Sequence, residues 1–206
     1  MSAIRQICKT APVIPVLVVE QLQHAQPMAQ ALISGGLPVL EVTLRTPVAL
    51  DAIRVMAEVE GGIVGAGTIL TPEDLRAAKQ AGAVFGVSPG ATEKLLQAAA
   101  EEDFMLLPGA ATGSEVMRLM EYGYDTMKFF PAEAAGGINM LKSLGGPLPQ
   151  VAFCPTGGVN PQNVSQYLAL SNVLCVGGTW VTPAEQVKAG DWAAIKQLAL
   201  QASQVK

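Results

Sequence analysis

The sequence predicts an α/β fold in which strands and helices alternate along the whole chain. Short apolar runs rich in β-branched residues alternate about eight times with longer amphipathic stretches, the order typical of a parallel sheet with helical crossovers. The 206 residues contain no linker, low-complexity tract or break in composition. We therefore expect a single domain over residues 1–206.

Eight strand–helix units favour a closed (β/α)8 barrel, the TIM barrel, over an open doubly wound sheet. The chain is shorter than the ~250 residues usual for that fold, so its loops must be short. Residues 2–9 precede the first apolar run and predict a short N-terminal helix.

The boundaries of the predicted elements follow from apolar periodicity and from helix start and stop residues. The strands are predicted at 13–19, 39–43, 63–66, 84–87, 104–107, 126–130, 151–154 and 173–176. The helices are predicted at 25–34, 47–59, 71–81, 92–101, 114–122, 138–144, 161–168 and 191–201. Thr71 and Pro72, followed by two acidic residues, form a strong helix start. Asn160 is expected to cap the helix that begins at Pro161.

The composition excludes several classes of function. A net charge of -4 without any cluster of Lys and Arg argues against nucleic acid and against an anionic membrane surface as partners. The apolar run 13–19 is too short to cross a bilayer, and no signal peptide is expected. Half of the residues are apolar and 15% are charged, so helices are expected to bury apolar faces against a partner subunit as well.

Histidine and cysteine usage narrows the chemistry further. The single histidine, His24, excludes a histidine dyad and metal sites built on several histidines. Cys8, Cys154 and Cys175 are widely spaced, and one of the three stays unpaired under any disulfide scheme. Buried thiols in a reducing cytoplasm are the expectation.

One lysine stands inside an apolar run. Lys128 lies in the predicted strand 126–130, and a lysine is almost never fully buried unless something compensates it. Burial disfavours the charged ammonium form, and a neutral amine attacks carbonyl carbon. Lys128 is therefore a candidate Schiff-base former, and the alternative is a lysine at a strand end that extends its head into water.

Strand alternation places further polar groups near this lysine. Glu41 and Arg45 share one face of the second strand, while Lys128 shares a face with Thr126 and Phe130. If both faces point inward, Lys128 and Glu41 meet inside the barrel, and Arg45 lies at its C-terminal rim. Such a pair is expected at a functional site, and the alternative is a structural ion pair.

Glycine pairs are predicted to follow the last two strands. Gly157-Gly158 stands beside Thr156, and Gly177-Gly178 stands beside Thr179. Paired glycines expose backbone N–H groups to an anion, and phosphate sites of this fold commonly use these two loops. The pattern predicts a phosphate site.

Five motifs together resemble one family. They are Glu-Val-Thr-Leu-Arg-Thr-Pro at 41–47, Gly-Ala-Gly-Thr at 65–68, Val-Ser-Pro-Gly at 87–90, Met-Lys-Phe-Phe-Pro-Ala-Glu at 127–133 and Cys-Pro-Thr-Gly-Gly-Val at 154–159. The chain resembles class I 2-keto-3-deoxy-6-phosphogluconate (KDPG) aldolases, also called 4-hydroxy-2-oxoglutarate aldolases, over essentially its whole length and in the correct order.

The resemblance implies a fold, a reaction and partners. It implies a (β/α)8 barrel assembled as a homotrimer, with no metal and no cofactor. The small-molecule substrate would be a keto-acid sugar phosphate, cleaved to pyruvate and glyceraldehyde 3-phosphate at the end of the Entner–Doudoroff pathway.

The resemblance also assigns roles to residues. Lys128 would form the Schiff base, Glu41 would act as the general acid/base, and Arg45 would hold the pyruvate carboxylate. The other implied binding residues are Thr68, Pro89, Phe130, Gly157, Gly158, Gly178 and Thr179, the last four for phosphate. Serine is frequent in the family where this chain has Thr179, which keeps the hydroxyl.

Two other functions stay open at this point. One is an aldolase for the C4 epimer, 2-keto-3-deoxy-6-phosphogalactonate. The other is a barrel that binds sugar phosphates without covalent chemistry, for which Lys128 opposite Glu41 would be unnecessary. Short 4-hydroxy-2-oxoglutarate, cleaved to pyruvate and glyoxylate, is a further candidate substrate because it keeps the pyruvate half, although it lacks the phosphate.

Overall fold

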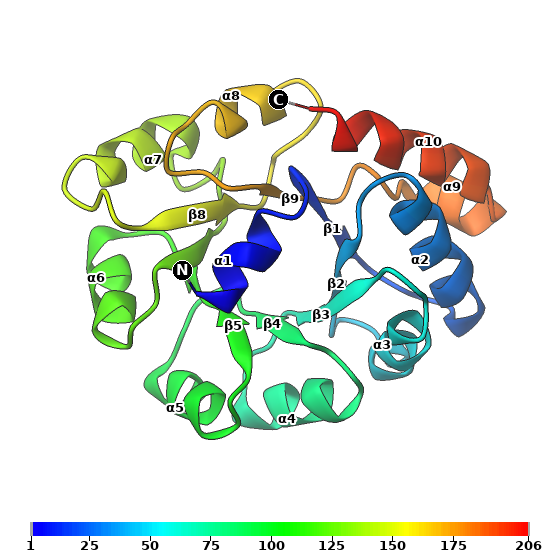
Figure 1. Cartoon of the computed structure of the whole chain (residues 1–206), viewed down its shortest axis with the longest axis horizontal. Coiled ribbons are helices and arrows are strands. Elements are labelled where there is room, and N and C mark those ends of the chain that lie inside the picture. The colour runs from blue at the N-terminus through cyan, green and yellow to red at the C-terminus, as the bar shows by residue number, and fades with distance from the viewer. Residues whose placement is uncertain (1, 206) are drawn as a thin grey trace.

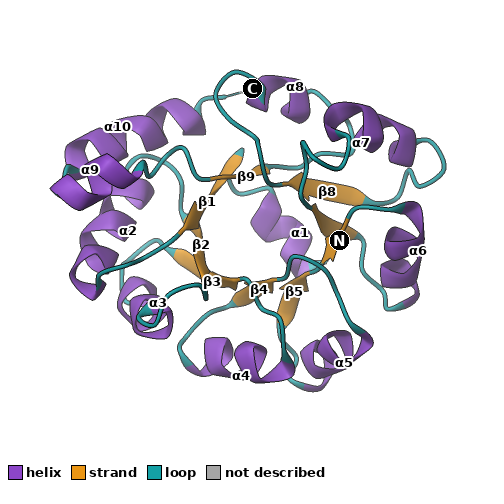
Figure 2. Ribbon diagram, turned by 180° about the vertical axis from the view of Figure 1, so that it is seen from behind, coloured by secondary structure: helices purple, strands orange, loops and turns teal. Residues whose placement is uncertain are grey.

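The computed structural model describes residues 2–205 as parallel strands curled around a common centre, with helices on the outside (Figures 1 and 2). The strands are β1 Val13–Leu17, β2 Val39–Thr43, β3 Ile63–Gly67, β4 Phe85–Val87, β5 Met105–Leu107, β6 Gly109–Ala110, β7 Thr126–Phe129, β8 Ala152–Pro155 and β9 Val176–Gly178. The helices are α1 Ala3–Cys8, α2 Ala25–Ser34, α3 Ala49–Ala57, α4 Pro72–Gln80, α5 Glu93–Glu101, α6 Gly113–Glu121, α7 Gly137–Gly145, α8 Val164–Leu168, α9 Ala184–Ala189 and α10 Trp192–Ser203, with a 3-10 turn, η1, at Leu22–His24.

All paired strands run parallel. One sheet has the order β5-β4-β3-β2-β1-β9, and the other has the order β6-β7-β8. Pro108 alone separates β5 from β6, and isolated parallel bridges join Phe153 to Val173 and Thr156 to Gly177. The chain therefore has an α/β fold with a strongly curled parallel sheet, as the alternation of strands and helices predicts.

The two faces of each strand contribute to different apolar layers. On β2, Leu40 and Val42 belong to the large core beneath the helices, whereas Val39 belongs to a smaller cluster inside the ring. On β7, Met127 and Phe129 likewise lie in the outer core. The predicted assignment of inward and outward faces is confirmed for both strands.

The short helix α1 covers one end of the ring. Both views show it across the middle of the circle of strands (Figures 1 and 2). Its residues Ile4 and Cys8 join the inner cluster, which also contains Cys154 and Cys175. All three cysteines are buried free thiols, as predicted for Cys154 and Cys175. Hydrogen bonding with the other two thiols, together with burial, raises the pKa of Cys175, so the thiol stays protonated.

The last strand and the helix before it differ from the prediction. The predicted strand 173–176 is wrong in position, because β9 begins at Val176 and includes both Gly177 and Gly178. Helix α8 begins at Val164 rather than at Pro161, because the 160–163 segment forms a turn in which the Asn160 N–H donates to Asn163 Oδ1. Elements β6, η1 and α9 are short and were not predicted.

No helix within residues 2–205 is both long enough and apolar enough to span a bilayer.

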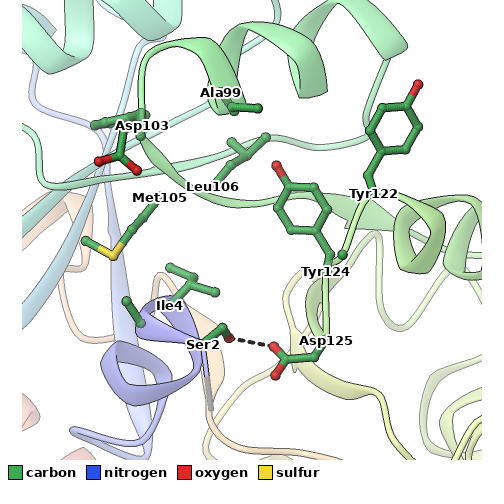
Figure 3. A pocket seen from close by; sticks show the side chains of 13 residues that line it. Ser2, Ile4, Ala99, Asp103, Met105, Leu106, Tyr122, Tyr124 and Asp125 are labelled. Carbon is green, nitrogen blue, oxygen red and sulfur yellow. Dashed lines mark hydrogen bonds between the residues drawn. The ribbon is translucent and has the colours of Figure 1, made fainter.

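The N-terminal segment is tied to the start of β7. Ser2 Oγ donates to Asp125 Oδ1 at 2.6 Å (Figure 3), Thr126 Oγ1 donates to the same oxygen at 2.9 Å, and Arg5 Nη1 lies 3.6 Å from Asp125 Oδ2. Burial alone would raise the pKa of Asp125, but the hydrogen bonds from Ser2 and Thr126 and the charge of Arg5 outweigh it and hold that pKa below its ordinary value. The ionised carboxylate therefore stabilises the docking of α1.

We expect Asp125→Asn to lower the free energy of unfolding by about 1 kcal/mol at pH 7. Because the pKa is depressed in the folded state, this contribution is present above the unfolded pKa near ~3.9 and is lost as pH falls through the folded value. Urea unfolding from pH 7 to pH 2.5 measures the difference. Asp103→Asn is the matched control, since Asp103 borders the same pocket and its side chain makes no hydrogen bond or ion pair to any described residue (Figure 3). A difference that persists at pH 2.5 would contradict the electrostatic account.

Candidate active site

A cavity of about 290 Å³ opens at the C-terminal ends of the strands, on the opposite side of the ring from α1. Its walls combine three ionisable groups with hydroxyls and glycines. The lining residues are Val16, Glu41, Thr43, Arg45, Thr68, Pro89, Lys128, Phe130, Thr156, Gly157, Gly158, Val159, Gly177 and Thr179. Every site residue predicted from the sequence except Gly178 is in this set.

The centre of the cavity is a buried ion pair between two strands that are not neighbours. Lys128 on β7 and Glu41 on β2 are 6% and 3% exposed, and Lys128 Nζ lies 3.1 Å from Glu41 Oε1. The ammonium also lies 5.2 Å from the centroid of the Phe130 ring, within range of a cation–π attraction. The predicted meeting of Lys128 and Glu41 is confirmed, and the alternative of a lysine head in bulk water is wrong.

Glycines on β3 make room for this pair. A Cβ on Gly67 would lie 2.3 Å from Glu41 Oε1, and a Cβ on Gly65 would lie 2.3 Å from Cζ of Phe85. Any side chain at these two positions would collide with the carboxylate or with the ring beneath it. The Gly-Ala-Gly sequence of β3 therefore shapes the interior around Glu41.

Arg45 lies in the turn after β2 and is oriented by Thr43, the last residue of that strand. Thr43 Oγ1 donates to the Leu17 carbonyl at 2.8 Å and accepts from Arg45 Nε at 3.1 Å. Within residues 2–205 the two terminal guanidinium nitrogens have no hydrogen-bond partner, so both are available to a ligand in the cavity. Guanidinium forks of this kind match a carboxylate in a bidentate geometry.

Thr68 lines the cavity in an unusual backbone conformation. Its φ is 61°, in the left-handed region, which is costly for a β-branched residue. Strain of this type persists where the surroundings enforce it, and it is frequent at functional sites. The structure thus places Thr68 at the rim in a conformation that packing must hold.

The loop after β8 is held by hydrogen bonds that its carbonyl groups accept on one side. The carbonyls of Thr156 and Gly157 accept from the Ala132 and Glu133 N–H groups at 2.8 and 3.1 Å. In a planar trans peptide the N–H points opposite to the C=O. The N–H groups of Gly157 and Gly158 therefore point away from residues 132–133. Both glycines have φ in the left-handed region, at 100° and 83°, a conformation that glycine adopts without steric cost.

Gly178 lies just outside the cavity. A Cβ on it would come within 2.0 Å of Cζ3 of Trp180, so the Trp180 ring occupies the space where a side chain would lie. Gly177 lines the cavity instead, and a Cβ there would be 2.2 Å from Thr156 Oγ1. This shift follows from the register of β9, which begins three residues later than predicted.

Three lining residues were not predicted at the site, namely Val16, Thr43 and Val159, whereas Thr156 and Gly177 belong to the predicted glycine-pair pattern but had no role assigned. Thr43 could have been found, because it shares a strand face with Glu41. Val16 could not, because its position depends on the β1–β2 register that pairs it with Glu41. Among residues 2–205 no group of three or more His, Cys, Asp or Glu side chains is arranged to hold a metal ion.

The fold and the site together define a class of enzyme: α/β proteins that hold a buried lysine beside a carboxylate at the C-terminal end of a parallel sheet. Residues 4–198 match the model of a single family, described as "KDPG and KHG aldolase". The chain is 54% identical to the "KHG/KDPG aldolase" of Escherichia coli (strain K12), covering 98% of this chain and 95% of that protein. It is 50% identical to the "2-dehydro-3-deoxy-phosphogluconate aldolase" of Dickeya dadantii, again covering 98% and 95%. The chain belongs to the KDPG and KHG aldolase family.

Solved structures agree in fold. The KDPG aldolase of Zymomonas mobilis ZM4 with 3-phosphoglycerate matches with a TM-score of 0.96 at 49% identity, covering 99% of this chain and 96% of that one. The KDPG aldolase of Legionella pneumophila, with pyruvate captured as a covalent carbinolamine intermediate, matches with a TM-score of 0.96 at 46% identity, covering 98% and 99%. A structure described as native KDPGal is less similar, with a TM-score of 0.79 at 27% identity over 94% and 96% of the chains.

We expect Gly67→Ala to displace the Glu41 carboxylate from Lys128 and to lower the rate of aldol cleavage about a hundredfold, the cost of a misplacement of about 1 Å. Steady-state assays with KDPG, together with a crystal structure of the variant, check both effects. Gly90→Ala is the matched control, because an added Cβ there meets no atom within 4 Å. A Gly67→Ala enzyme with full activity and an unchanged Glu41–Lys128 separation would show that β3 does not position the carboxylate.

Proposed function

We propose that this chain is a class I aldolase that cleaves KDPG to pyruvate and glyceraldehyde 3-phosphate through a Schiff base on Lys128. The buried pair of Lys128 Nζ and Glu41 Oε1, 3.1 Å apart, is the observation that carries this proposal. A purely structural ion pair would not need an open cavity against both side chains, and both line one. The names of relatives at 46–54% identity and the pyruvate carbinolamine of the Legionella pneumophila enzyme support the same chemistry.

Lys128 would begin the reaction. Its neutral amine attacks the C2 ketone, gives a carbinolamine and then, after loss of water, an iminium ion. The positive iminium nitrogen accepts the electron pair of the C3–C4 bond as that bond breaks. The enamine that results takes a proton at C3, and hydrolysis of the iminium releases pyruvate.

Glu41 would move the protons. With its oxygen 3.1 Å from Nζ, the carboxylate can accept a proton from the ammonium and return it during dehydration of the carbinolamine. Directly or through a water, it would also take the proton of the C4 hydroxyl during cleavage. Arg45, with its free guanidinium nitrogens, would hold the carboxylate of the keto acid near Thr68.

The loops would hold the other end of the substrate. The exposed N–H groups of Gly157 and Gly158 and the hydroxyl of Thr179 would receive the phosphate, with Gly178 contributing only through its backbone. Pro89 and Phe130 would form the walls. The name of the Zymomonas mobilis structure, with 3-phosphoglycerate, supports an affinity of this family for a three-carbon phosphate.

We further propose the finer architecture and setting. The continuity of β5 and β6 around Pro108 and the bridges from β8 to β9 support a closed eight-stranded (β/α)8 barrel formed by one domain. A homotrimer is proposed from the family resemblance, and a cytoplasmic location from the three free thiols, which fit a reducing compartment.

Of the two alternative substrates, the C4 epimer of KDPG is less well supported, whereas 4-hydroxy-2-oxoglutarate is compatible with the names of the relatives. The relatives and solved structures named for KDPG are 33–54% identical, whereas the KDPGal structure is 27% identical, which favours KDPG over its C4 epimer. The name "KHG/KDPG aldolase" of the Escherichia coli relative supports 4-hydroxy-2-oxoglutarate as a second substrate. Side-by-side kinetics on the three keto acids separate these possibilities.

The Schiff base is tested by chemical trapping. We expect borohydride, added in the presence of pyruvate, to attach the reduced adduct to Lys128, as mapped by peptide mass spectrometry. Lys128→Met should lose both the adduct and turnover, because it keeps apolar volume but has no amine. Lys142→Met, on the exposed surface of α7, is the control and should retain both. An adduct on another residue of the intact protein would reject the assignment and favour a binding barrel without covalent chemistry.

The proton-transfer role is tested by Glu41→Gln. This variant keeps a hydrogen-bond acceptor for Lys128 but cannot take up a proton, so we expect kcat to fall about 10²–10⁴-fold. Equilibrium binding of pyruvate should change far less, because the Arg45 contact is intact. A variant that loses pyruvate binding and turnover to the same extent would indicate a positioning role for Glu41 instead.

A further inference from the structure

The loop that follows β8 is held from behind at three successive carbonyl groups. The carbonyls of Thr156 and Gly157 accept from the backbone of residues 132–133, as described above. The third, that of Gly158, accepts from the side-chain amides of Asn160 and Asn163 at 3.0 and 3.1 Å. Since each fixed carbonyl fixes the N–H of the next residue, the direction of the three N–H groups at Gly157, Gly158 and Val159 depends on these contacts.

The side chain of Glu133 also packs against this loop. A Cβ on Gly158 would lie 2.5 Å from Cγ and 2.7 Å from Cβ of Glu133, so the stem of Glu133 lies directly against that glycine. The left-handed backbone of Gly158, with φ of 83°, is therefore packed against Glu133 on its rear side.

Tyr167 holds Glu133 in this position. Tyr167 lies on α8 and is completely buried, and its hydroxyl donates a hydrogen bond to Glu133 Oε1. A Cβ on Gly137, the first residue of α7, would lie 3.1 Å from the Tyr167 hydroxyl and 3.2 Å from the same carboxylate oxygen, so the backbone of α7 lies against one side of the bond, whereas Glu133 itself is an exposed residue. Helices α7 and α8 lie next to each other outside β8 in both views (Figures 1 and 2). Burial raises the pKa of Tyr167, and the Glu133 carboxylate raises it further. The hydroxyl therefore stays protonated and remains a hydrogen-bond donor throughout the neutral range.

We infer that Tyr167 and Glu133 are positioning residues for the phosphate end of the substrate: the Tyr167 hydroxyl holds the Glu133 side chain behind Gly158, which aims the loop N–H groups into the cavity. This inference rests on the proposed function and deepens it. Neither residue lines the cavity, so both act through the loop.

The tyrosine has a second consequence for anion binding. Glu133 carries a carboxylate close to N–H groups that are directed at an anion. While the Glu133 carboxylate is hydrogen-bonded to Tyr167, it stays on the rear side of the loop. Without that hydrogen bond, the carboxylate would compete with the substrate phosphate for the same N–H groups and would repel the phosphate. Tyr167 thus keeps an internal anion out of the site.

The test compares substrates with and without phosphate. We expect Tyr167→Phe to raise KM for KDPG about tenfold, the loss expected for one hydrogen bond to a charged group, with kcat little changed. Cleavage of 4-hydroxy-2-oxoglutarate, which has no phosphate, should be unaffected, as should trapping of pyruvate on Lys128. Adding Glu133→Gln to Tyr167→Phe should restore part of the affinity for KDPG, because the competing charge is removed.

The control is Tyr124→Phe. Tyr124 is partly buried and borders the pocket at the opposite end of the ring (Figure 3), and its hydroxyl makes no hydrogen bond to a described residue. This variant should behave as the wild type on both substrates. Thermal unfolding of all variants separates loss of fold from loss of recognition.

Two kinetic results and one binding result would overturn the inference. Equal loss on both substrates would mean that Tyr167 supports the fold only, and an unchanged KM for KDPG would mean that the loop needs no such support. Equilibrium binding of inorganic phosphate to wild type and to Tyr167→Phe gives a readout without turnover. If the wild type binds phosphate more tightly than the variant but does not cleave KDPG, the proposed function fails and the inference stands; if phosphate binds equally to both, the inference fails.

Discussion

A salt bridge enclosed within the sheet is the interaction on which the rest of the structure depends. Removing two charges from water costs several kcal/mol per ion, and mutual attraction compensates this only with good geometry. Lys128 and Glu41 come from strands on different sheets, so the whole curled sheet must form before their head groups meet. The fold thus brings the two head groups together. Substituting either residue would leave the other charge buried without a partner, which is costly.

The interior of the ring is divided into an apolar end and a polar end. Below Glu41 and Lys128, the cluster of Ile4, Val39, Phe85 and the cysteines fills the interior under α1. Above the pair lie hydroxyls, glycines and Arg45. Water is excluded from one side only, so the amine is desolvated and yet open to a substrate that enters from the other side. The three buried thiols belong to this apolar floor of the cavity.

Local sequence patterns are enough to predict where the two side chains proposed to carry the chemistry, Glu41 and Lys128, lie. Alternation along 39–43 and 126–130 is sufficient to place Glu41 and Lys128 on inward faces, because side chains in a strand have a period of two. The same rule fails at β9, where consecutive glycines carry no apolar pattern and the strand extends through them. The bond between Tyr167 and Glu133, 34 residues apart, has no local signature at all. It depends on how α7 and α8 pack, which only the folded chain determines.

This contrast follows from where the two halves of the site are built. The residues that would act on the pyruvate half belong to strands, or directly follow them, and are fixed by the sheet. The groups that would meet the phosphate are backbone N–H groups of a loop, and a loop has no sheet partner to orient it on both sides. It must be held from outside by side chains such as Glu133 and Asn163. Chemistry and phosphate recognition are therefore physically separable in this fold, which explains how relatives can be named for both a phosphorylated and an unphosphorylated keto acid.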